Sequence, residues 1–209
     1  MTRLRIALAK GRLYQPSVER FGRAGAELEG DPGRRLLLPS SDPRIEFLVV
    51  KPGDVPVYVE SGAADLGITG TDVLRETGAD VLEPLELGFG FCRLVVATPA
   101  DGPYPALPGG VTARVATKYP RLAREHFNAQ GRPVDIIRVD GSVEVAPLLN
   151  LSHWIVDLVD TGNTLRANGL VERETILSVQ AVLVANRASQ KLKLEQYLDL
   201  MRRLAGAVP

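Results

Sequence analysis

Short apolar runs alternate along the chain with segments whose apolar residues fall at helical spacing. A short apolar run bounded by turn residues predicts a strand, and a helical period predicts a helix that buries one face. Strands are expected at residues 4–9, 34–39, 45–50, 64–68, 92–97, 114–117 and 134–139, at the start of the run 154–165 and within 176–185, and helices at 14–24, 52–60, 73–76, 120–129, 165–169 and 190–204, with a short one opened by 141–144. This alternation is typical of an α/β protein.

The main interruption is the segment 98–110, where four prolines and three glycines in thirteen residues exclude a helix or a central strand. An interdomain linker is one interpretation. The flanking runs look like strands of one sheet, however, which favours a surface excursion inside a lobe. The run 176–185 and the helix after it are expected to return to the first lobe. Two lobes are therefore expected, 1–90 plus 175–209 and 91–174, with a cleft between them.

The charges balance, because Lys and Arg total 25, Asp and Glu also total 25, and the net charge is zero. No global field therefore draws the chain to nucleic acid or to a membrane surface, and an anion site must be a local cluster. The apolar runs are far shorter than a membrane span and the N-terminus lacks the apolar core of a signal peptide, so a cytoplasmic location is expected. A single cysteine, Cys92, excludes an internal disulfide, and with only His126 and His153 a Cys/His zinc site is excluded.

The segment 154–165 carries the most informative chemistry. An apolar strand with an acidic end leads into a hydroxyl-rich turn, which a helix continues. Such a turn offers backbone N–H groups and the hydroxyls of Thr161 and Thr164 at a helix N-terminus, where the dipole favours negative charge. Asp157 and Asp160 repel a phosphate, but as acceptors and Mg²⁺ ligands they suit the ribose hydroxyls beside one. The pattern predicts a ribose 5-phosphate site; a capped turn without a ligand is the alternative.

Two further turns follow strands in the first half of the chain. Lys10-Gly11-Arg12 places two cations around a glycine, where the backbone can approach a ligand closely, although a solvated corner is the alternative. Thr69-Gly70-Thr71-Asp72 is a second glycine- and hydroxyl-rich turn before a helix. Neither the Walker loop nor the dinucleotide-binding glycine pattern is present. Turns of this kind at strand ends predict a ligand cleft, the usual location in open α/β sheets.

These motifs resemble, in this order and over nearly the whole chain, the short form of the ATP phosphoribosyltransferase family, the first enzyme of histidine biosynthesis. The fragments that carry the resemblance are LAKGRL at 8–13, KPGDVP at 51–56, DLGITG at 65–70, CRLVVA at 92–97, ATKYP at 116–120, GSVEVAP at 141–147 and DLVDTGNTL at 157–165. Each fragment alone is modestly specific. Their order along a chain of this length makes the resemblance specific.

The resemblance implies a fold like the type II periplasmic binding proteins, with two α/β lobes. It implies that the phosphoribosyl group of phosphoribosyl pyrophosphate is transferred to N1 of the adenine of ATP. Because that nitrogen carries no proton, no general base is needed, and positioning and electrostatics should dominate. The first lobe is expected to form the dimer contact and to provide the side of the site that binds the nucleotide and the pyrophosphate. The second lobe is expected to provide the phosphoribosyl-binding loop.

The resemblance also implies residue roles. Lys10 and Arg12 are expected to face the pyrophosphate or the ATP phosphates, and Glu144 and Asp157 to lie near the ribose hydroxyls and Mg²⁺, the expected cofactor. These four are the catalytic candidates. The expected substrate-binding residues are Gly11, Lys51, Asp72, Tyr119, Asp160, Thr161, Gly162, Asn163 and Thr164. Among these, Lys51, Asp72 and Tyr119 also fit ordinary helix-start roles, and Lys51 is a candidate for a contact across a dimer interface.

Two departures from the family bear on function. Many relatives carry an Asp where this chain has Ser152-His153-Trp154, so that acid is absent and His153-Trp154 is expected to pack. The chain ends at Pro209, whereas long-form relatives carry a further histidine-binding domain. The resemblance therefore implies a homodimer that joins a histidyl-tRNA-synthetase-like regulatory subunit in a hetero-oligomer, with histidine control supplied by that subunit.

Two other classes of protein remain open at this point. A small-solute-binding protein has the same two-lobed architecture and closes on its ligand without catalysis, and a fold alone does not settle function. A phosphoribosyltransferase for a base other than the adenine of ATP is the second. The phosphate turn with its carboxylates favours the enzyme over a plain solute binder, and the motifs of the first lobe favour this family over other phosphoribosyltransferases.

Overall fold

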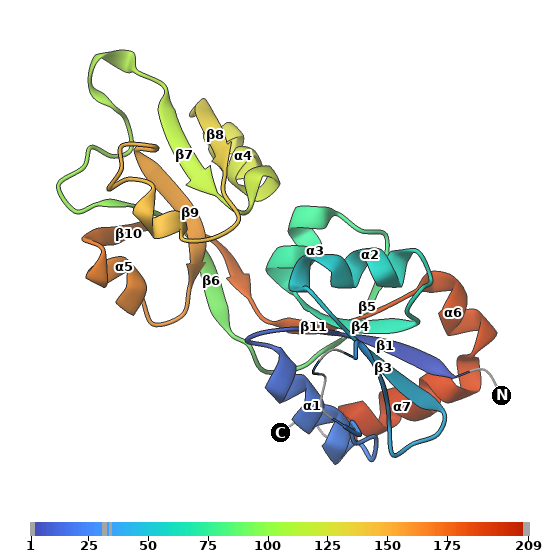
Figure 1. Ribbon diagram of the computed structural model, residues 1–209. Coiled ribbons are helices and arrows are strands. Elements are labelled where there is room, and N and C mark those ends of the chain that lie inside the picture. Colours follow the sequence, from blue (N-terminus) through green and yellow to red (C-terminus); the bar gives the residue numbers. More distant parts are fainter. Residues whose placement is uncertain (1–2, 31–32, 34, 207–209) are drawn as a thin grey trace. The chain divides into compact units, whose positions relative to one another are not determined.

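The computed structural model describes residues 3–30, 33 and 35–206. The chain divides into two compact units, which we call unit 1 (Met1–Gly90 with Gln180–Pro209) and unit 2 (Phe91–Val179) (Figure 1). The return to the first unit was expected at residue 175, and in the structure unit 1 resumes at Gln180. Strand β10 (Leu170–Val179) stays paired with strand β6 (Cys92–Pro99) as far as Val179, so its hydrogen bonds keep residues 175–179 in unit 2.

Unit 1 is built on a six-stranded sheet with the order β2-β3-β1-β4-β11-β5. Its strands are β1 (Leu4–Ala9), β2 (Leu37–Pro39), β3 (Ile45–Val50), β4 (Leu66–Gly70), β5 (Leu82–Glu86) and β11 (Ala181–Ala185). Strand β1 runs parallel to both of its neighbours, β3 and β4, and is buried on both faces, which explains its nearly continuous apolar sequence. The expected strand from residue 34 begins outside the described residues and is seen from Leu37.

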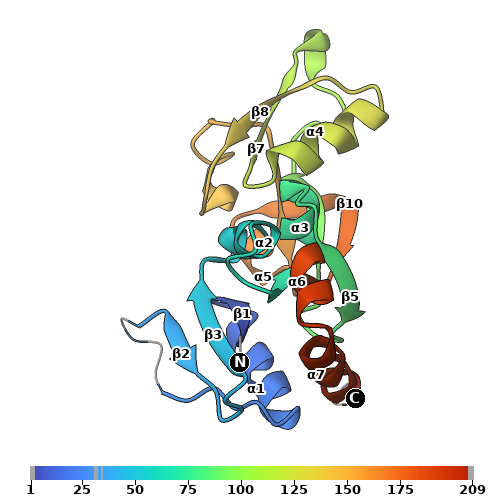
Figure 2. The same cartoon turned by 90° about the vertical axis from the view of Figure 1, so that its right-hand side faces the viewer.

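Helices cover both faces of this sheet. They are α1 (Tyr14–Arg23), the 3₁₀ turn η1 (Pro52–Asp54), α2 (Val55–Glu60), α3 (Thr71–Thr77), α6 (Arg187–Leu192) and α7 (Leu194–Gly206). Figures 1 and 2 show α2 and α3 on one face and α1 with α7 on the other. Helix α2 approaches strand β4 so closely that a Cβ atom at Gly67 would lie 2.7 Å from a methyl group of Val55. The last helix was expected to be continuous over 190–204, and it is instead broken at Lys193.

Unit 2 is built on a five-stranded sheet with the order β10-β6-β9-β7-β8. Besides β6 and β10, its elements are β7 (Ala113–Thr117), β8 (Val134–Arg138), β9 (Trp154–Val159), the helices α4 (Pro120–Ala129) and α5 (Asn163–Ala167), and the 3₁₀ turns η2 (Pro108–Gly110) and η3 (Val143–Val145). Strands β7, β8 and β9 are parallel to one another, and β6 is antiparallel to β9. The carboxyl ends of β7, β8 and β9 therefore meet at one edge of the sheet.

Two apolar clusters lie on opposite faces of this second sheet. Side chains alternate along β9, so Trp154 and Val156 join the cluster under α4, while Ile155 and Val159 join the cluster under η3 and α5. The same alternation places Asp157 on the η3 and α5 face. None of the described helices is long and apolar enough to cross a membrane.

Candidate active site

The loop from Asp160 to Thr164 leaves the carboxyl end of β9, and we call it the phosphate loop. Asp160, Thr161, Asn163 and Thr164 are exposed. Gly162 has φ +77°, a left-handed conformation that glycine adopts without strain, and it immediately precedes α5. Helix α5 has five residues, so its dipole adds little, and the chemistry of the loop resides in its own N–H and hydroxyl groups.

Every carbonyl at the start of the phosphate loop already accepts a hydrogen bond. The carbonyl of Asp160 accepts from Nη1 of Arg93 at 2.9 Å, and that of Thr161 accepts from Nη2 of Arg166 at 3.1 Å. The carbonyl of Gly162 accepts from the backbone N–H of Arg166 at 3.1 Å.

The hydrogen-bond donors of the loop, in contrast to its carbonyls, are unused. Within the described residues, no hydrogen bond is donated by the N–H groups of Thr161, Gly162 and Asn163 or by the hydroxyls of Thr161 and Thr164. The backbone at the start of the loop therefore presents unused donors while its carbonyls are occupied, which is the arrangement that an anion requires.

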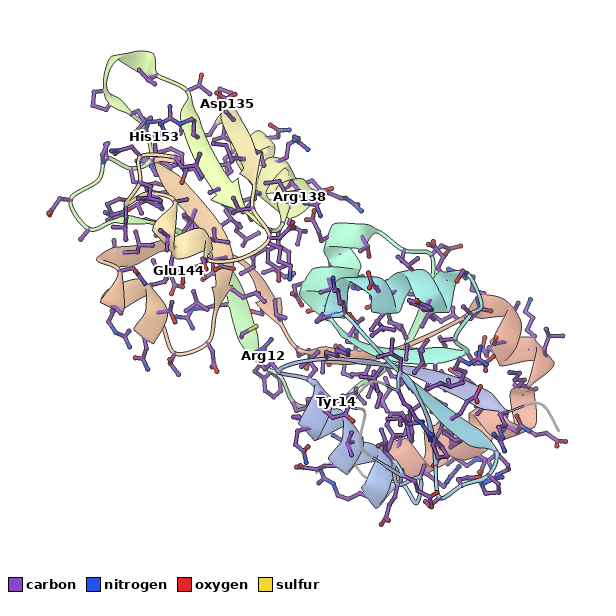
Figure 3. The ribbon with its side chains drawn as sticks, viewed as in Figure 1. Arg12, Tyr14, Asp135, Arg138, Glu144 and His153 are labelled. Carbon is purple, nitrogen blue, oxygen red and sulfur yellow. The ribbon has the colours of Figure 1, made fainter. Side chains whose placement is uncertain are left out.

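Two carboxylates lie on the same side of unit 2. Asp157 is half-buried in β9, and its Oδ1 accepts the N–H of Leu158 at 2.8 Å. Burial raises the pKa of Asp157; the Leu158 hydrogen bond opposes this shift, the negative charge of Glu144 adds to it, and the charge of Lys118 opposes it. Glu144, labelled in Figure 3, lies in η3, which begins directly after Ser142, a non-glycine residue with φ +48°. Backbone strain of this kind is concentrated at functional sites.

Tyr119 does not accompany these groups. Its side chain is 4% exposed and belongs to the apolar cluster under α4, and its N–H donates to Oγ1 of Thr117 at 2.9 Å. Tyr119 immediately precedes α4, so the helix-start role fits its position. Trp154 is also packed in that cluster, as expected, and Nδ1 of the half-buried His153 accepts the N–H of Arg114 at 2.9 Å.

The candidate residues of unit 1 gather at the carboxyl edge of its three parallel strands. Lys10 and Lys51 follow the paired residues at the ends of β1 and β3, and the N–H of Lys10 donates to the carbonyl of Val50 at 2.8 Å. Lys10, Arg12 and Lys51 are exposed, and Gly11 has φ +86°. Figure 3 shows Arg12 where the chain leaves β1. This edge therefore gathers cationic side chains on a backbone that can approach a ligand closely.

Asp72 differs from these cations because its side chain is only 3% exposed. A Cβ atom at Gly70 would lie 2.0 Å from its Oδ1, so the carboxylate packs directly on the glycine Cα. Gly70 is thus required for this turn to close. The burial of Asp72 fits a role in shaping the turn ahead of α3.

Sequence reasoning missed three residues of the site in unit 2, Lys118, Arg93 and Arg166. Lys118 follows β7 at the same sheet edge and faces Asp157, which its place after a predicted strand could have indicated. Arg93 lies within an apolar run, and Arg166 on a helix surface. Their contacts with loop carbonyls depend on the folded geometry, which no local pattern encodes.

The fold and the site define a class of protein, an α/β chain of two units with a loop of unused hydrogen-bond donors at a strand end. Residues 51–206 match the profile of the family HisG, ATP phosphoribosyltransferase. The chain is 50% identical over 207 residues to the ATP phosphoribosyltransferase of Sorangium cellulosum and 48% identical over 207 residues to that of Halorhodospira halophila, covering in both cases 98% of this chain and 95% of the relative. The chain belongs to the ATP phosphoribosyltransferase family, and it is a pentosyltransferase of histidine biosynthesis.

Solved structures agree with this assignment. The ATP phosphoribosyltransferase (HisG:HisZ) complex of Thermotoga maritima contains a chain that superposes with a TM-score of 0.86 at 32% identity, with 98% of each chain covered. The periplasmic aliphatic sulphonate binding protein SsuA of Escherichia coli superposes with a TM-score of 0.60 at 12% identity, over 99% of this chain and 72% of that one. The second likeness shows the fold alone, and it confirms the expected type II binding-protein architecture.

Proposed function

We propose that the phosphate loop of unit 2 binds the 5′-phosphate of phosphoribosyl pyrophosphate, whose phosphoribosyl group the chain transfers to N1 of the adenine of ATP. The observation that carries this proposal is the polarity of the loop: the carbonyls of Asp160 to Gly162 are occupied, and the N–H and hydroxyl donors beside them are not. Thr161, Gly162, Asn163 and Thr164 form this anion site, and Asp160 lies at its start.

Positive charge grows on the ribose as pyrophosphate leaves, so negative charge near the sugar stabilises the transition state. Asp157 and Glu144 are the carboxylates of unit 2 that we assign to this purpose, and they also suit the ribose hydroxyls. Adenine N1 attacks with its own lone pair and no proton is removed. Orientation of the two substrates then supplies much of the acceleration.

Unit 1 contributes cations in this proposal. Lys10, Arg12 and Lys51 bind the pyrophosphate or the phosphates of ATP, with Gly11 allowing close approach of the backbone. Asp72 shapes the neighbouring turn through Gly70. Tyr119 packs at the start of α4 and is left out of the proposed nucleotide contacts.

The residues present fit a magnesium ion. Glu144 and Asp157 repel each other, since the charge of Glu144 contributes to the raised pKa of Asp157, and a cation would relieve this repulsion. Magnesium is usually held by one or two carboxylates, with substrate phosphates and water completing its shell. Accordingly, the described residues contain no cluster of three or more His, Cys, Asp or Glu side chains that could hold a metal alone. When bound, the ion would supply positive charge to the pyrophosphate.

We propose the partners and the location by analogy with the family. The solved relative from Thermotoga maritima is a HisG:HisZ complex, which supports a regulatory subunit like histidyl-tRNA synthetase for this chain as well. We further propose a homodimer as the unit that docks with this subunit. Both substrates are metabolites of the cytoplasm, and the chain is proposed to act there.

The alternative of a solute-binding protein without catalysis is not favoured by any particular observation. Its support is the likeness to SsuA, at 12% identity, which concerns the fold alone. A direct assay separates the two functions, because an enzyme mixed with ATP, Mg²⁺ and phosphoribosyl pyrophosphate forms phosphoribosyl-ATP and pyrophosphate. A binder would consume neither substrate.

The double variant Thr161→Val with Thr164→Val tests the phosphate loop. Valine keeps the shape and removes the two unused hydroxyl donors, so the affinity for phosphoribosyl pyrophosphate measured by calorimetry should fall about tenfold or more. ATP affinity and the melting temperature should stay unchanged. Thr77→Val is a matched control, since that hydroxyl donates within α3 to the carbonyl of Val73. Unchanged affinity for phosphoribosyl pyrophosphate would contradict the assignment of the loop.

A further inference from the structure

We infer that Arg93, held by Glu172, is a positioning residue that fixes the phosphate loop in its anion-accepting form. This inference rests on the proposed function of that loop. Arg93 lies on β6, on the same sheet face as Val95 and Ala97, which is the face that carries α5. Its backbone pairs with Val159, the last residue before the loop.

The guanidinium of Arg93 is shared between two partners. Its Nε lies 2.8 Å and 3.0 Å from the two carboxylate oxygens of Glu172, and its Nη2 lies 2.6 Å from Oε2. The remaining Nη1 donates to the carbonyl of Asp160. A planar guanidinium with several fixed donors can satisfy a carboxylate and a carbonyl at once, whereas a lysine ammonium acts as a point charge.

Glu172 lies on the same sheet face as Arg93 because it pairs with Ala97 of β6. Directly opposed residues of paired strands place their side chains on one face, and Ala97 shares its face with Arg93. The register of β10 shifts only after this pair, between Glu172 and Glu174 and again between Thr175 and Leu177. The hydroxyl of Thr175 also donates to Oε1 of Glu172 at 3.3 Å, so the carboxylate is itself oriented.

The consequence for the loop is directional. A peptide unit whose carbonyl is anchored on one side must present its N–H group on the other. Anchoring the carbonyl of Asp160 therefore aims the N–H of Thr161, which belongs to the same peptide unit. Arg166 does the same for the next unit through the carbonyl of Thr161, and it also donates to Oδ1 of Asn163 at 2.6 Å.

If the Arg93–Glu172 pair had a purely structural role, its loss would lower the melting temperature. The side chains are 37% and 30% exposed, and pairs of this exposure contribute little to stability. Loss of the Arg93 contact should therefore leave the melting temperature nearly unchanged, while the N–H groups of the loop lose their fixed orientation. Because the 5′-phosphate takes no part in the chemistry, the loss should raise KM for phosphoribosyl pyrophosphate and change kcat little.

The test compares Arg93→Lys and Glu172→Gln with the wild type in steady-state kinetics. Arg93→Lys should raise KM for phosphoribosyl pyrophosphate about tenfold, with KM for ATP and kcat within about twofold. Glu172→Gln should shift the same constant in the same direction by less, because Arg93 keeps its contact with Asp160. Millimolar guanidinium added to Arg93→Ala should restore part of the loss, which a change in packing would not allow.

Arg75→Lys is the matched control, because Arg75 forms a similar two-pronged pair with Glu83 in unit 1, at 2.7 Å and 3.0 Å. It should leave all kinetic constants unchanged. If Arg93→Lys keeps the wild-type KM while the Thr161 and Thr164 double variant raises it, the positioning role is wrong and the loop assignment stands. If neither changes KM, the loop assignment itself is wrong. A fall in kcat with unchanged KM would also contradict the positioning role.

Discussion

At the scale of single residues, the negative charge of Asp157 opposes stability. It is half-buried, its pKa is raised by burial, and Glu144 adds to that shift. A raised carboxyl pKa means that the folded chain binds this proton more readily than the unfolded chain does. The ionised form therefore weakens the folded state, and the loss sets in as the pH rises through the acidic range between the unfolded and folded pKa values.

Asp157→Asn should therefore separate activity from stability. The change removes a full charge at nearly constant volume, so kcat should fall about 100-fold or more if the carboxylate acts near the ribose. The melting temperature at pH 7 without magnesium should stay the same or rise. Calorimetry and the product assay measure the two effects. Asp135→Asn, an exposed carboxylate on β8 labelled in Figure 3, is the control, and wild-type turnover of Asp157→Asn would contradict the proposal.

The sequence allowed Asp157 and the phosphate loop to be proposed because they follow one another along a single strand and turn. Arg93 could not be found in this way. Its partner Glu172 is 79 residues away and its contact with Asp160 spans 67 residues. These separations are bridged by the pairing of β6 with β9 and β10, and that pairing depends on the whole sheet.

At the scale of elements, the strands that were predicted well are those buried on both faces. Strands β1 and β3 begin and end at the expected residues because only one charged residue interrupts each apolar run. Strand β5 was not predicted, since its sequence Leu-Glu-Pro-Leu-Glu suits a strand only at a sheet edge, which is where it lies. The expected run 176–185 is two strands that belong to different units and are separated at Gln180.

Strand β10 was predicted only in its second half because charged residues interrupt its apolar pattern. In the folded chain Glu172 pairs with Arg93, Arg173 donates to Thr98, and Glu174 pairs with Arg132. This edge strand is thus joined to its surroundings by polar contacts as well as by its ladder. Local apolar periodicity cannot indicate such contacts.

Glu174 provides the prediction at this scale, because it joins β10, α4 and the proline-rich segment. Burial alone would raise its pKa, but hydrogen bonds from Tyr104, Gln130 and His126 and the charge of Arg132 outweigh burial and lower the pKa to about 2. A carboxyl with a lowered pKa stabilises the fold above its unfolded pKa, and this stabilisation is lost as the pH falls from about 4.5 toward about 2.

Glu174→Gln should consequently destabilise the chain by about 2 kcal/mol at pH 7, since it weakens several hydrogen bonds to a charged acceptor. The difference from the wild type should shrink when denaturant unfolding is repeated near pH 3. Glu125→Gln is the control, because Glu125 forms an exposed pair with Arg121 on α4. If Glu174→Gln lowers the free energy of unfolding equally at both pH values, the charge of Glu174 does not contribute to stability.

At the scale of the whole molecule, the chain exposes large apolar side chains in both units. Leu192 and Leu194 are 83% and 50% exposed in unit 1, and Leu149 is 73% exposed in unit 2. The net charge is zero, so no general repulsion keeps copies apart. Both properties suit a chain that works in an assembly, and the relative from Thermotoga maritima was solved in one.

The last prediction concerns that assembly. Light scattering after size exclusion should give the isolated chain twice its mass of 22.6 kDa, and a larger complex should form when a HisZ-type subunit is added. The resemblance to short-form enzymes implies that this subunit is like histidyl-tRNA synthetase, so the histidine pocket is expected there. Histidine should therefore inhibit phosphoribosyl-ATP formation by the complex and leave the isolated chain unaffected. As a control for crowding, the isolated chain is mixed with an unrelated protein whose mass is similar to that of the HisZ-type subunit. Histidine inhibition of the isolated chain, competitive with neither substrate, would place the sensor in this polypeptide and contradict control by a partner.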